Sequence, residues 1–404
     1  MLLTLAWRNI WRNKRRSLIV MTSIVVGVLM VFFTNGFMNG MLSQMLKNQI
    51  SSSVSHILIH KKGFNDNKVI QSYIPDPTLV ESVINNRSGI KSYSKKLISF
   101  GLLSSATNSS GVYINGVNPG KEKDVTKIKE SIVKGTYLTE NKRDLVIGKK
   151  LAEKLEVEVG DKVVAMANTP DGSIGAEMFR IAGIYKTFSS EFDKIYIYAN
   201  KEITQKMLEV EGKEYEFAII CNDYKQADAV KVKLKSQLPD DYEVLSYIDL
   251  LPMIIFQIDM SKNWMWILNI IVGVALIFGI INTMLMSVYE RIQEIGVLMS
   301  IGMKNIKIIS MITLEAFILG VIGTVGGVLF SLLVMWPFYN SGINLALFSE
   351  GLNSFGVGAV IYPVLNIDDF AATLIILPIV SVLAALYPAY KAVKLEPIYA
   401  VRYV

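Results

Sequence analysis

The sequence predicts an integral membrane α-helical protein, with four transmembrane helices and a large extracytoplasmic α+β domain inserted between helices 1 and 2. Three observations predict this class. Of the 404 residues, 51% are hydrophobic and only 19% are charged, as is typical of membrane proteins. Four long segments carry almost no charge. Between the first two lies a stretch, residues 47–262, in which 30 basic and 28 acidic residues accompany short apolar segments.

Residues 1–16 predict a cytoplasmic interfacial helix. Trp7 and Trp11 recur at helical spacing among five basic residues and no acid, which suits the headgroup region of a membrane with anionic lipid. Residues 17–46 then carry 30 uncharged positions. A helix of that length spans about 45 Å and exceeds the roughly 30 Å hydrocarbon core. We therefore expect transmembrane helix 1 to continue outward as a stalk.

Residues 47–262 predict a soluble α+β domain, because strand-like and helix-like segments alternate in a charge-balanced stretch. Alternating apolar positions predict strands at 55–60, 97–105, 111–117, 162–167, 179–184, 194–199 and 215–221. Helical spacing predicts helices at 77–85, 148–155, 201–209 and 224–238. Thr169 to Gly172 (TPDG) predict a tight turn between two of the strands.

The remaining chain predicts three more membrane helices and their connections. Their expected bounds are 263–289 for helix 2, 290–307 for a cytoplasmic segment, 308–338 for helix 3, 339–369 for an extracytoplasmic loop, 370–390 for helix 4 and 391–404 for a cytoplasmic tail. The loop carries only acids and the first 16 residues only bases. The positive-inside rule then places both termini in the cytoplasm and residues 47–262 in the periplasm or outside the cell.

Predicted helix 3 contains a face of glycines and one ionisable residue. Gly320, Gly323 and Gly327 form a small face that permits close helix packing. Glu315 is an ionisable group about two turns inside the helix. Such a group is costly in a membrane, and we favour a structural ion pair or hydrogen bond over a role in carrying protons.

The segment 290–303, ERIQEIGVLMSIGM, is the most specific stretch of the chain. Ile292, Ile295, Leu298 and Met299 recur three and four residues apart and predict a short amphipathic helix on the membrane surface, which Gly302 would end. The segment resembles the coupling segment of the MacB, LolC/LolE and FtsX family of ABC-transporter permeases. The matching positions are Glu290, Arg291, Glu294, Ile295, Gly296, Val297, Leu298, Ile301 and Gly302, and Met299 replaces the usual arginine.

Other stretches carry the same resemblance. They are LAWRNIWRNKRRS at the start, NGF at 35–37, the order of motifs from 111 to 185, and the tail with Pro388, Ala389, Ala392, Pro397, Ala400 and Arg402. In LolC-type subunits an extended loop hooks a periplasmic lipoprotein carrier. Here the equivalent interval, 167–179, is short, which puts direct recruitment of a carrier by this chain in doubt.

The sequence lacks the groups needed to use ATP or to catalyse a reaction. No G-x-x-x-x-G-K-[ST] phosphate loop, zinc-protease motif or nucleophile elbow occurs. The single cysteine allows no intramolecular disulfide, and His56 and His60 lie well separated on a predicted strand. We expect no catalytic residue, metal or cofactor in this chain and no nucleic-acid partner. The resemblance implies a cytoplasmic ATP-binding subunit that holds ATP and magnesium, a second permease subunit in a homodimer or heterodimer, and membrane lipid, with a periplasmic carrier or adaptor as a further candidate.

The resemblance also implies a mechanism for a bacterial inner-membrane protein. Glu290, Arg291 and Glu294 would make polar contacts to the ATP-binding subunit, Ile295 and Leu298 would fill its groove, and Gly296 and Gly302 would allow close approach. Motion of this segment would be passed to the outer domain. Three functions remain open: extraction of lipoproteins from the outer leaflet, which we favour, MacB-like export of peptides or amphipathic small molecules, and FtsX-like signalling to a cell-wall hydrolase. A membrane-bound enzyme is the weakest alternative.

Overall fold

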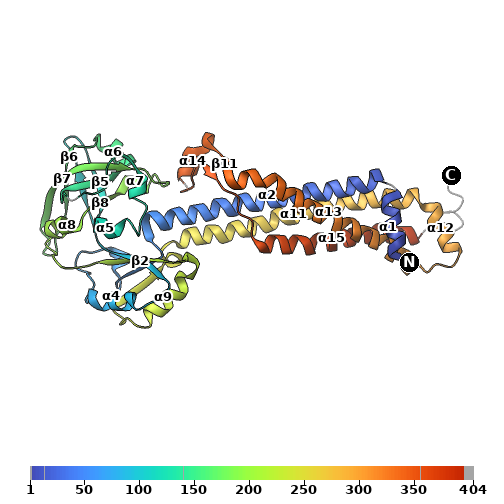
Figure 1. Cartoon of the computed structure of the whole chain (residues 1–404), viewed down its shortest axis with the longest axis horizontal. Helices are drawn as coiled ribbons and strands as arrows, with labels where there is room; N and C mark the ends of the chain where they lie inside the picture. The colour runs from blue at the N-terminus through green and yellow to red at the C-terminus, as the bar shows by residue number, and fades with distance from the viewer. Residues whose placement is uncertain (1, 13, 140, 355, 395–404) are drawn as a thin grey trace. The chain divides into compact units, whose positions relative to one another are not determined.

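The computed structural model describes residues 2–12, 14–139, 141–354 and 356–394 (Figure 1). Its internal contacts divide the chain into two compact units. The membrane unit comprises Met1–Leu42, Gln257–Asn344 and Val360–Val404, and the sheet unit comprises Ser43–Phe256 and Leu345–Ala359. The sheet unit therefore includes a part of the loop between the third and fourth membrane helices, which the sequence did not indicate.

Long helices form the membrane unit. They and the short helices beside them are α1 (Leu2–Arg12), α2 (Lys14–Gln49), α11 (Pro252–Glu290), α12 (Ile292–Ser300), α13 (Asn305–Ser341) and α15 (Ile367–Val393). Within the described residues, four helices are long and apolar enough to cross a membrane, namely α2, α11, α13 and residues Phe370–Val393 of α15. The predicted number and order of membrane helices are confirmed. Residues 395–404, which include Pro397, Ala400 and Arg402, lie outside the described part of the chain.

Helix α11 begins 11 residues before the predicted start at 263. Pro252 is accepted at a first helical position, where its missing N–H is not needed. Asp259 and Lys262 had suggested the end of the soluble domain, but they lie three residues apart on the helix and form an ion pair of 3.1 Å. Both α2 and α11 thus contribute residues to each of the two units.

Helix α13 packs against α2 and α15 through the predicted glycines. A Cβ at Gly323 would lie 3.0 Å from the Cβ of Ile24, and one at Gly327 would lie 2.9 Å from that of Val28, both on α2. A Cβ at Gly320 would lie 2.7 Å from the Ser381 hydroxyl on α15. The three glycines therefore admit two neighbouring helices rather than one, which fits the role predicted for small residues in helix packing.

Two glycines of α2 admit the chain that returns to α15. The amide N–H of Val364 donates a hydrogen bond of 2.8 Å to the carbonyl of Gly36. A Cβ at Gly40 would collide with the backbone carbonyl of Tyr362. Helix α13 ends at Gly342, with φ of +70°, and the short strands β11 (Ile343–Asn344) and β12 (Val360–Ile361) pair beyond it. These glycines, near the outer end of the predicted first membrane helix, are thus packing positions.

A ten-stranded mixed sheet forms the sheet unit. Its strands are β1 (Ile57–Lys61), β2 (Ile90–Ser104), β3 (Ser109–Val117), β4 (Ile132–Gly135), β5 (Asp144–Gly148), β6 (Lys162–Asn168), β7 (Ile174–Tyr185), β8 (Tyr196–Asn200), β9 (Glu216–Cys221) and β10 (Tyr242–Ser246). Their order is β10-β1-β9-β2-β3-β8-β5-β7-β4, and β6 pairs with β2 and β7. Strands β3 and β8 run parallel, as do β5 and β7.

Short helices accompany the sheet. The α-helices are α3 (Phe64–Asn67), α4 (Pro77–Asn85), α5 (Pro119–Glu122), α6 (Lys149–Leu155), α7 (Phe192–Ile195), α8 (Lys201–Met207), α9 (Ala227–Lys235), α10 (Tyr247–Leu250) and α14 (Ser349–Ser354). A π-helical turn follows α2 at Ile50–Val54, and 3₁₀ turns lie at Lys129–Ser131, Tyr224–Gln226 and Ala346–Phe348. The carboxylate of Asp76 caps α4 by accepting from the backbone N–H groups of Thr78 and Leu79.

The sequence predicted most of these elements but missed β4, β5 and β10. Every residue of β5 is buried, so it shows no alternation that would set it apart from other short apolar runs. The segment predicted as a strand from 194 begins as the helix α7. The turn predicted at Thr169 to Gly172 is confirmed, since Gly172 has φ of +87° and donates its N–H to the Thr169 carbonyl at 3.0 Å.

Candidate functional site

The candidate site is the charged turn between α11 and α13, which contains α12. As predicted, a short helix forms here and ends at Gly302, whose φ is +91°. The N–H of Gly302 donates to the carbonyl of Met299, and the N–H of Met303 donates to that of Leu298, each at 3.0 Å. This pair of hydrogen bonds is the glycine-dependent end that satisfies the last carbonyls of a helix.

One face of α12 packs into the core of the membrane unit. Ile292 and Ile295 are only 4% and 2% exposed, and Ile295 belongs to the same buried cluster as Val288, Ile308 and Ile312. Gly296 is also buried, and Leu298 is partly buried. The prediction that Ile295 fills a groove of a partner is therefore wrong, because its side chain is already enclosed by its own chain.

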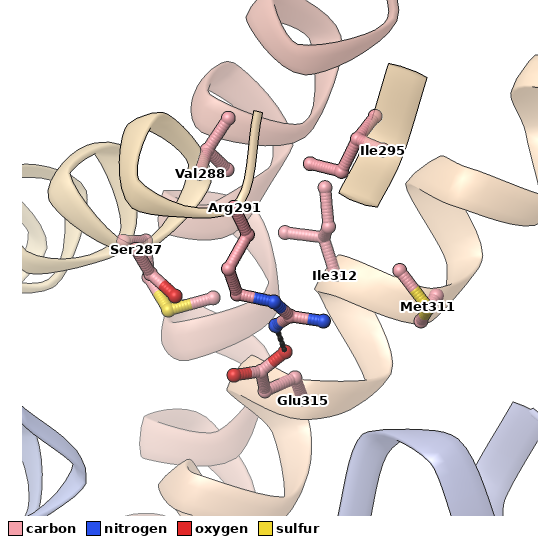
Figure 2. Close-up of a pocket in the computed structure, with 8 residues that line it drawn as sticks. Ser287, Val288, Arg291, Ile295, Met311, Ile312 and Glu315 are labelled. Carbon is pink, nitrogen blue, oxygen red and sulfur yellow. Dashed lines mark hydrogen bonds and ion pairs between the residues drawn. The ribbon is translucent and has the colours of Figure 1, made fainter. Parts of the chain in front are cut away.

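A buried ion pair fastens the start of α12 to α13. Figure 2 shows the Arg291 side chain directed at Glu315, and Nη1 of Arg291 donates to Oε2 of Glu315 at 3.1 Å. Both side chains are about one-tenth exposed or less. They line a cavity of about 10 Å³ together with residues of α11, α12 and α13, a volume comparable to a single water molecule.

This ion pair confirms the structural contact predicted for Glu315. The residue lies deeper than expected, because α13 begins at Asn305 rather than at residue 308. Removing one partner of such a buried pair costs far more than the pair contributes, since the other charge is left without compensation. Arg291, which the sequence assigned to the ATP-binding subunit, instead holds the turn against the third membrane helix.

Two arginines near the N-terminus hold the acidic residues of the turn. Nη2 of Arg12 donates to both carboxylate oxygens of Glu294, at 2.6 and 2.7 Å, and Arg16 forms an ion pair with Glu290. The Nε atom of Arg291 also donates to Glu294, at 3.3 Å. The sequence predicted that Arg12 and Arg16 face lipid and did not indicate these contacts, because no sequence pattern pairs residues 282 positions apart.

The contacts of Glu294 affect its ionisation. Partial burial favours its neutral form, but the hydrogen bonds and positive charges of Arg12 and Arg291 outweigh burial and hold the pKa of the Glu294 carboxyl below its usual value. The side chains of Arg12 and Glu294 are each about half exposed. An exposed pair of this kind contributes about 1 kcal/mol or less to stability.

Three apolar side chains are exposed among the polar residues at and beside the turn. Val297 is 47% exposed, Ile301 is 78% exposed and Ile306 is 65% exposed. Gly302 lies exposed beside Ile301. These residues, rather than Ile295, are available to a partner. The sequence could have indicated Val297 and Ile301, because neither lies on the buried face of the helix.

A second feature of the membrane unit is an apolar cavity of about 610 Å³ formed by α2, α11 and α15. About half of its lining residues are aliphatic, with Trp266 and Gly273 from α11, and four asparagines also line it: Asn35, Asn39, Asn269 and Asn366. Lys262 and Asp368 supply charged groups to the same lining. An apolar cavity of this size with a few polar groups is typical of sites for small or chain-like ligands.

The fold is that of a membrane-spanning protein with a large inserted domain, and comparison with known proteins identifies it as a permease and gives its family. Residues 17–237 match the model of the MacB-like periplasmic core domain. Residues 266–397 match the FtsX-like permease C-terminal model. The chain belongs to the family of ABC-transporter permeases that combine these two domains.

Three similar proteins support this family assignment. The chain is 25% identical to the lipoprotein-releasing system transmembrane protein LolC of Neisseria meningitidis, over 79% of each chain. It is 27% identical to the uncharacterized ABC transporter permease MJ1507 of Methanocaldococcus jannaschii, over 70% of this chain and 69% of that one. It is 33% identical to the macrolide export ATP-binding/permease protein MacB 1 of Aeromonas hydrophila, over 30% of this chain and 16% of that protein. Membership of this family implies an ATP-binding partner subunit.

Proposed function

We propose that this chain is a permease subunit that transmits the work of a cytoplasmic ATP-binding subunit to an extracytoplasmic domain, and that the complex extracts lipoproteins from the membrane. The observation that carries the proposal is the similarity to LolC over about four-fifths of both chains. The MacB-like domain, within residues 17–237, lies between the first two membrane helices, as this mechanism requires.

The apolar cavity supports a cargo with acyl chains. It is formed by α2, α11 and α15, has a volume of about 610 Å³, and combines an aliphatic lining with Lys262 and Asp368. Lipid chains bury apolar surface in such a cavity, while the charged groups suit the polar part of an acylated protein. The cavity thus favours an amphipathic cargo over a fully polar one.

The steric test of the cavity uses two glycines of α11. Gly273 lines the cavity, and a Cβ added there meets no atom within 4 Å. Gly279 is equally open, lies on the same helix and is absent from the lining. We expect Gly273→Trp to block ATP-dependent release of a triacylated lipoprotein from proteoliposomes and Gly279→Trp to leave it unchanged. Normal release by Gly273→Trp would contradict the role of the cavity, and no release by the unmodified complex would contradict lipoprotein as the cargo.

We further propose that Val297, Ile301 and Ile306 dock the ATP-binding subunit. They are the exposed apolar residues of the coupling turn, and apolar side chains at the centre of an interface carry much of its binding energy. Ile301→Asp should abolish co-purification with the ATP-binding subunit. The matched control is Ile174→Asp, because Ile174 is 70% exposed but lies on β7 of the sheet unit. Retained association in Ile301→Asp would exclude this surface.

MacB-like export is the second candidate, and the short β6–β7 connection favours it. The turn at Thr169 to Gly172 leaves no extended loop to engage a carrier. The same proteoliposomes distinguish the two candidates: ATPase activity stimulated by amphipathic peptides, without release of lipoprotein, would favour export.

A further inference from the structure

We propose that Arg12 and Arg16 are positioning residues that connect the coupling turn to α2, so that motion of the turn reaches α2 as well as the two membrane helices to which the turn is covalently joined. This inference rests on the proposed function and specifies how the turn acts. The turn is joined covalently to α11, which ends at Glu290, and to α13, which begins at Asn305. It has no covalent link to α2, so only contacts between side chains can move α2 together with it.

The contacts that join the turn to α2 come from the corner between α1 and α2. Arg12 is the last residue of α1 and Arg16 lies in the first turn of α2. Each contacts a different acid of the turn, Glu294 and Glu290 respectively. Glu290 and Glu294 flank Arg291 in the sequence, and Arg291 is itself held by Glu315. Three arginines and three glutamates thus form a charge-neutral cluster around the start of α12.

The corner that carries the two arginines is itself fixed. The buried hydroxyl of Ser17 donates to the carbonyl of Ile10 at 2.7 Å, which ties α2 back to α1 across their junction. Ile10 is 1% exposed and lies in the same buried cluster as Ile295 of the turn and Val20 of α2. A displacement of α12 therefore acts on a packed corner and not on a loose terminus.

The remaining basic residues of the corner lack this arrangement. Arg8, Lys14 and Arg15 are exposed, and within the described part of the chain they form no ion pair with an acid. The basic N-terminal residues therefore divide into two groups. Arg8, Lys14 and Arg15 are free to face lipid headgroups, as the positive-inside pattern requires, whereas Arg12 and Arg16 face the coupling turn.

The link is needed because α2 and α11 both continue into the sheet unit. If the turn moved α11 alone, the two helices would shear past each other, and the packed contacts between neighbouring membrane helices oppose such sliding. Ion pairs suit this task, since they hold orientation without requiring a covalent bond and can re-form after a displacement. Networks of ion pairs and packed side chains can carry energetic coupling between distant sites.

The test measures motion of α2 and α11 in the complete complex with its ATP-binding subunit. Spin labels are attached at Lys47→Cys and Met253→Cys in a Cys221→Ser background, since both positions are exposed and Cys221 is the single native cysteine. We expect ATP with vanadate to shift the distance between the labels. Arg12→Gln/Arg16→Gln should lose this shift and lower ATP-dependent lipoprotein release about tenfold, the scale of coupling energies measured for linked sites, while co-purification with the ATP-binding subunit is retained.

A conservative variant, a charge-reversed pair and a control distinguish loss of the ion pairs from a general loss of structure. Arg12→Lys keeps the charge and should retain the shift. Arg16→Glu should lose the shift, and Arg16→Glu/Glu290→Arg should restore it by re-forming the pair with reversed signs. Arg15→Gln, which removes a neighbouring exposed charge, should change neither readout. A shift of wild-type size in Arg12→Gln/Arg16→Gln, or no rescue by the reversed pair, would overturn the inference alone. No shift in the unsubstituted complex would overturn the proposed function, and the inference with it.

Discussion

The membrane unit is held together differently at the coupling turn and at the glycine contacts of α2. Around the turn, Arg12, Arg16 and Arg291 reach acidic side chains through hydrogen bonds and ion pairs. At Gly40 the backbone of residues 362 and 363 lies directly against α2, and the carbonyl of Gly36 accepts a hydrogen bond from the N–H of Val364. The first kind of contact tolerates rotation and re-pairing of long side chains. The second tolerates almost no change of distance, because van der Waals repulsion is steep.

This difference indicates where the membrane unit can change shape and where it cannot. A turn that receives force from a partner requires contacts that can break and re-form, whereas helices that transmit force require fixed spacing.

The largest effect should come from breaking the buried ion pair at the turn. Arg291→Met leaves the Glu315 carboxylate buried without a partner, which costs roughly 3–5 kcal/mol. Arg291→Met/Glu315→Leu removes both charges and should recover most of that loss. Thermal unfolding in detergent measures both variants. Equal destabilisation in the single and double variants would show that lost packing, and not an uncompensated charge, is responsible.

A smaller but clear loss should follow from a single methyl group at the glycine contacts. Gly40→Ala places a Cβ against the carbonyl of Tyr362, and overpacking of this kind costs roughly 1–3 kcal/mol. Gly279→Ala serves as the control, because its Cβ meets no atom within 4 Å and should be neutral or slightly stabilising. The same unfolding measurement compares them. Equal stability of the two variants would mean that the chain at 362–364 adjusts freely.

The exposed pair at the turn should contribute little to stability despite its proposed role in coupling. Arg12→Ala should lower stability by about 1 kcal/mol or less, since both side chains of the pair are half exposed. The unfolding temperature should therefore change little, while the distance shift between the labelled helices is reduced. A large loss of stability would place Arg12 in the structural core of the unit instead.

The smallest effect should be a dependence on pH confined to the turn. The folded-state pKa of Glu294 is lowered from 4.5, so its stabilising contribution is present above about pH 4.5 and is lost as the pH falls through the lowered value. The stability difference between the wild type and Glu294→Gln should therefore be present at neutral pH and disappear in acid. The difference between the wild type and Gly40→Ala should not follow this titration, because no charge is involved.

Much of the fold could be predicted because its signals are local. The four apolar stretches follow from composition, and the short helix and its end at Gly302 follow from apolar spacing and one glycine. The misses were local too: β5 is buried throughout and shows no alternation, and the extra turns of α11 begin at a proline that sequence patterns associate with helix starts as readily as with loops.

Four membrane spans, and a short amphipathic helix between the second and the third, can be predicted from local sequence, because both properties depend on residues within a few turns of one another. Which arginine contacts which glutamate, which face of α12 is buried and which glycines admit a neighbouring backbone depend on how the whole unit packs. The charged side chains of the turn could form several alternative pairs. Folding brings Arg12 to Glu294 and Tyr362 to Gly40 across long separations, and packing of the whole unit selects those partners.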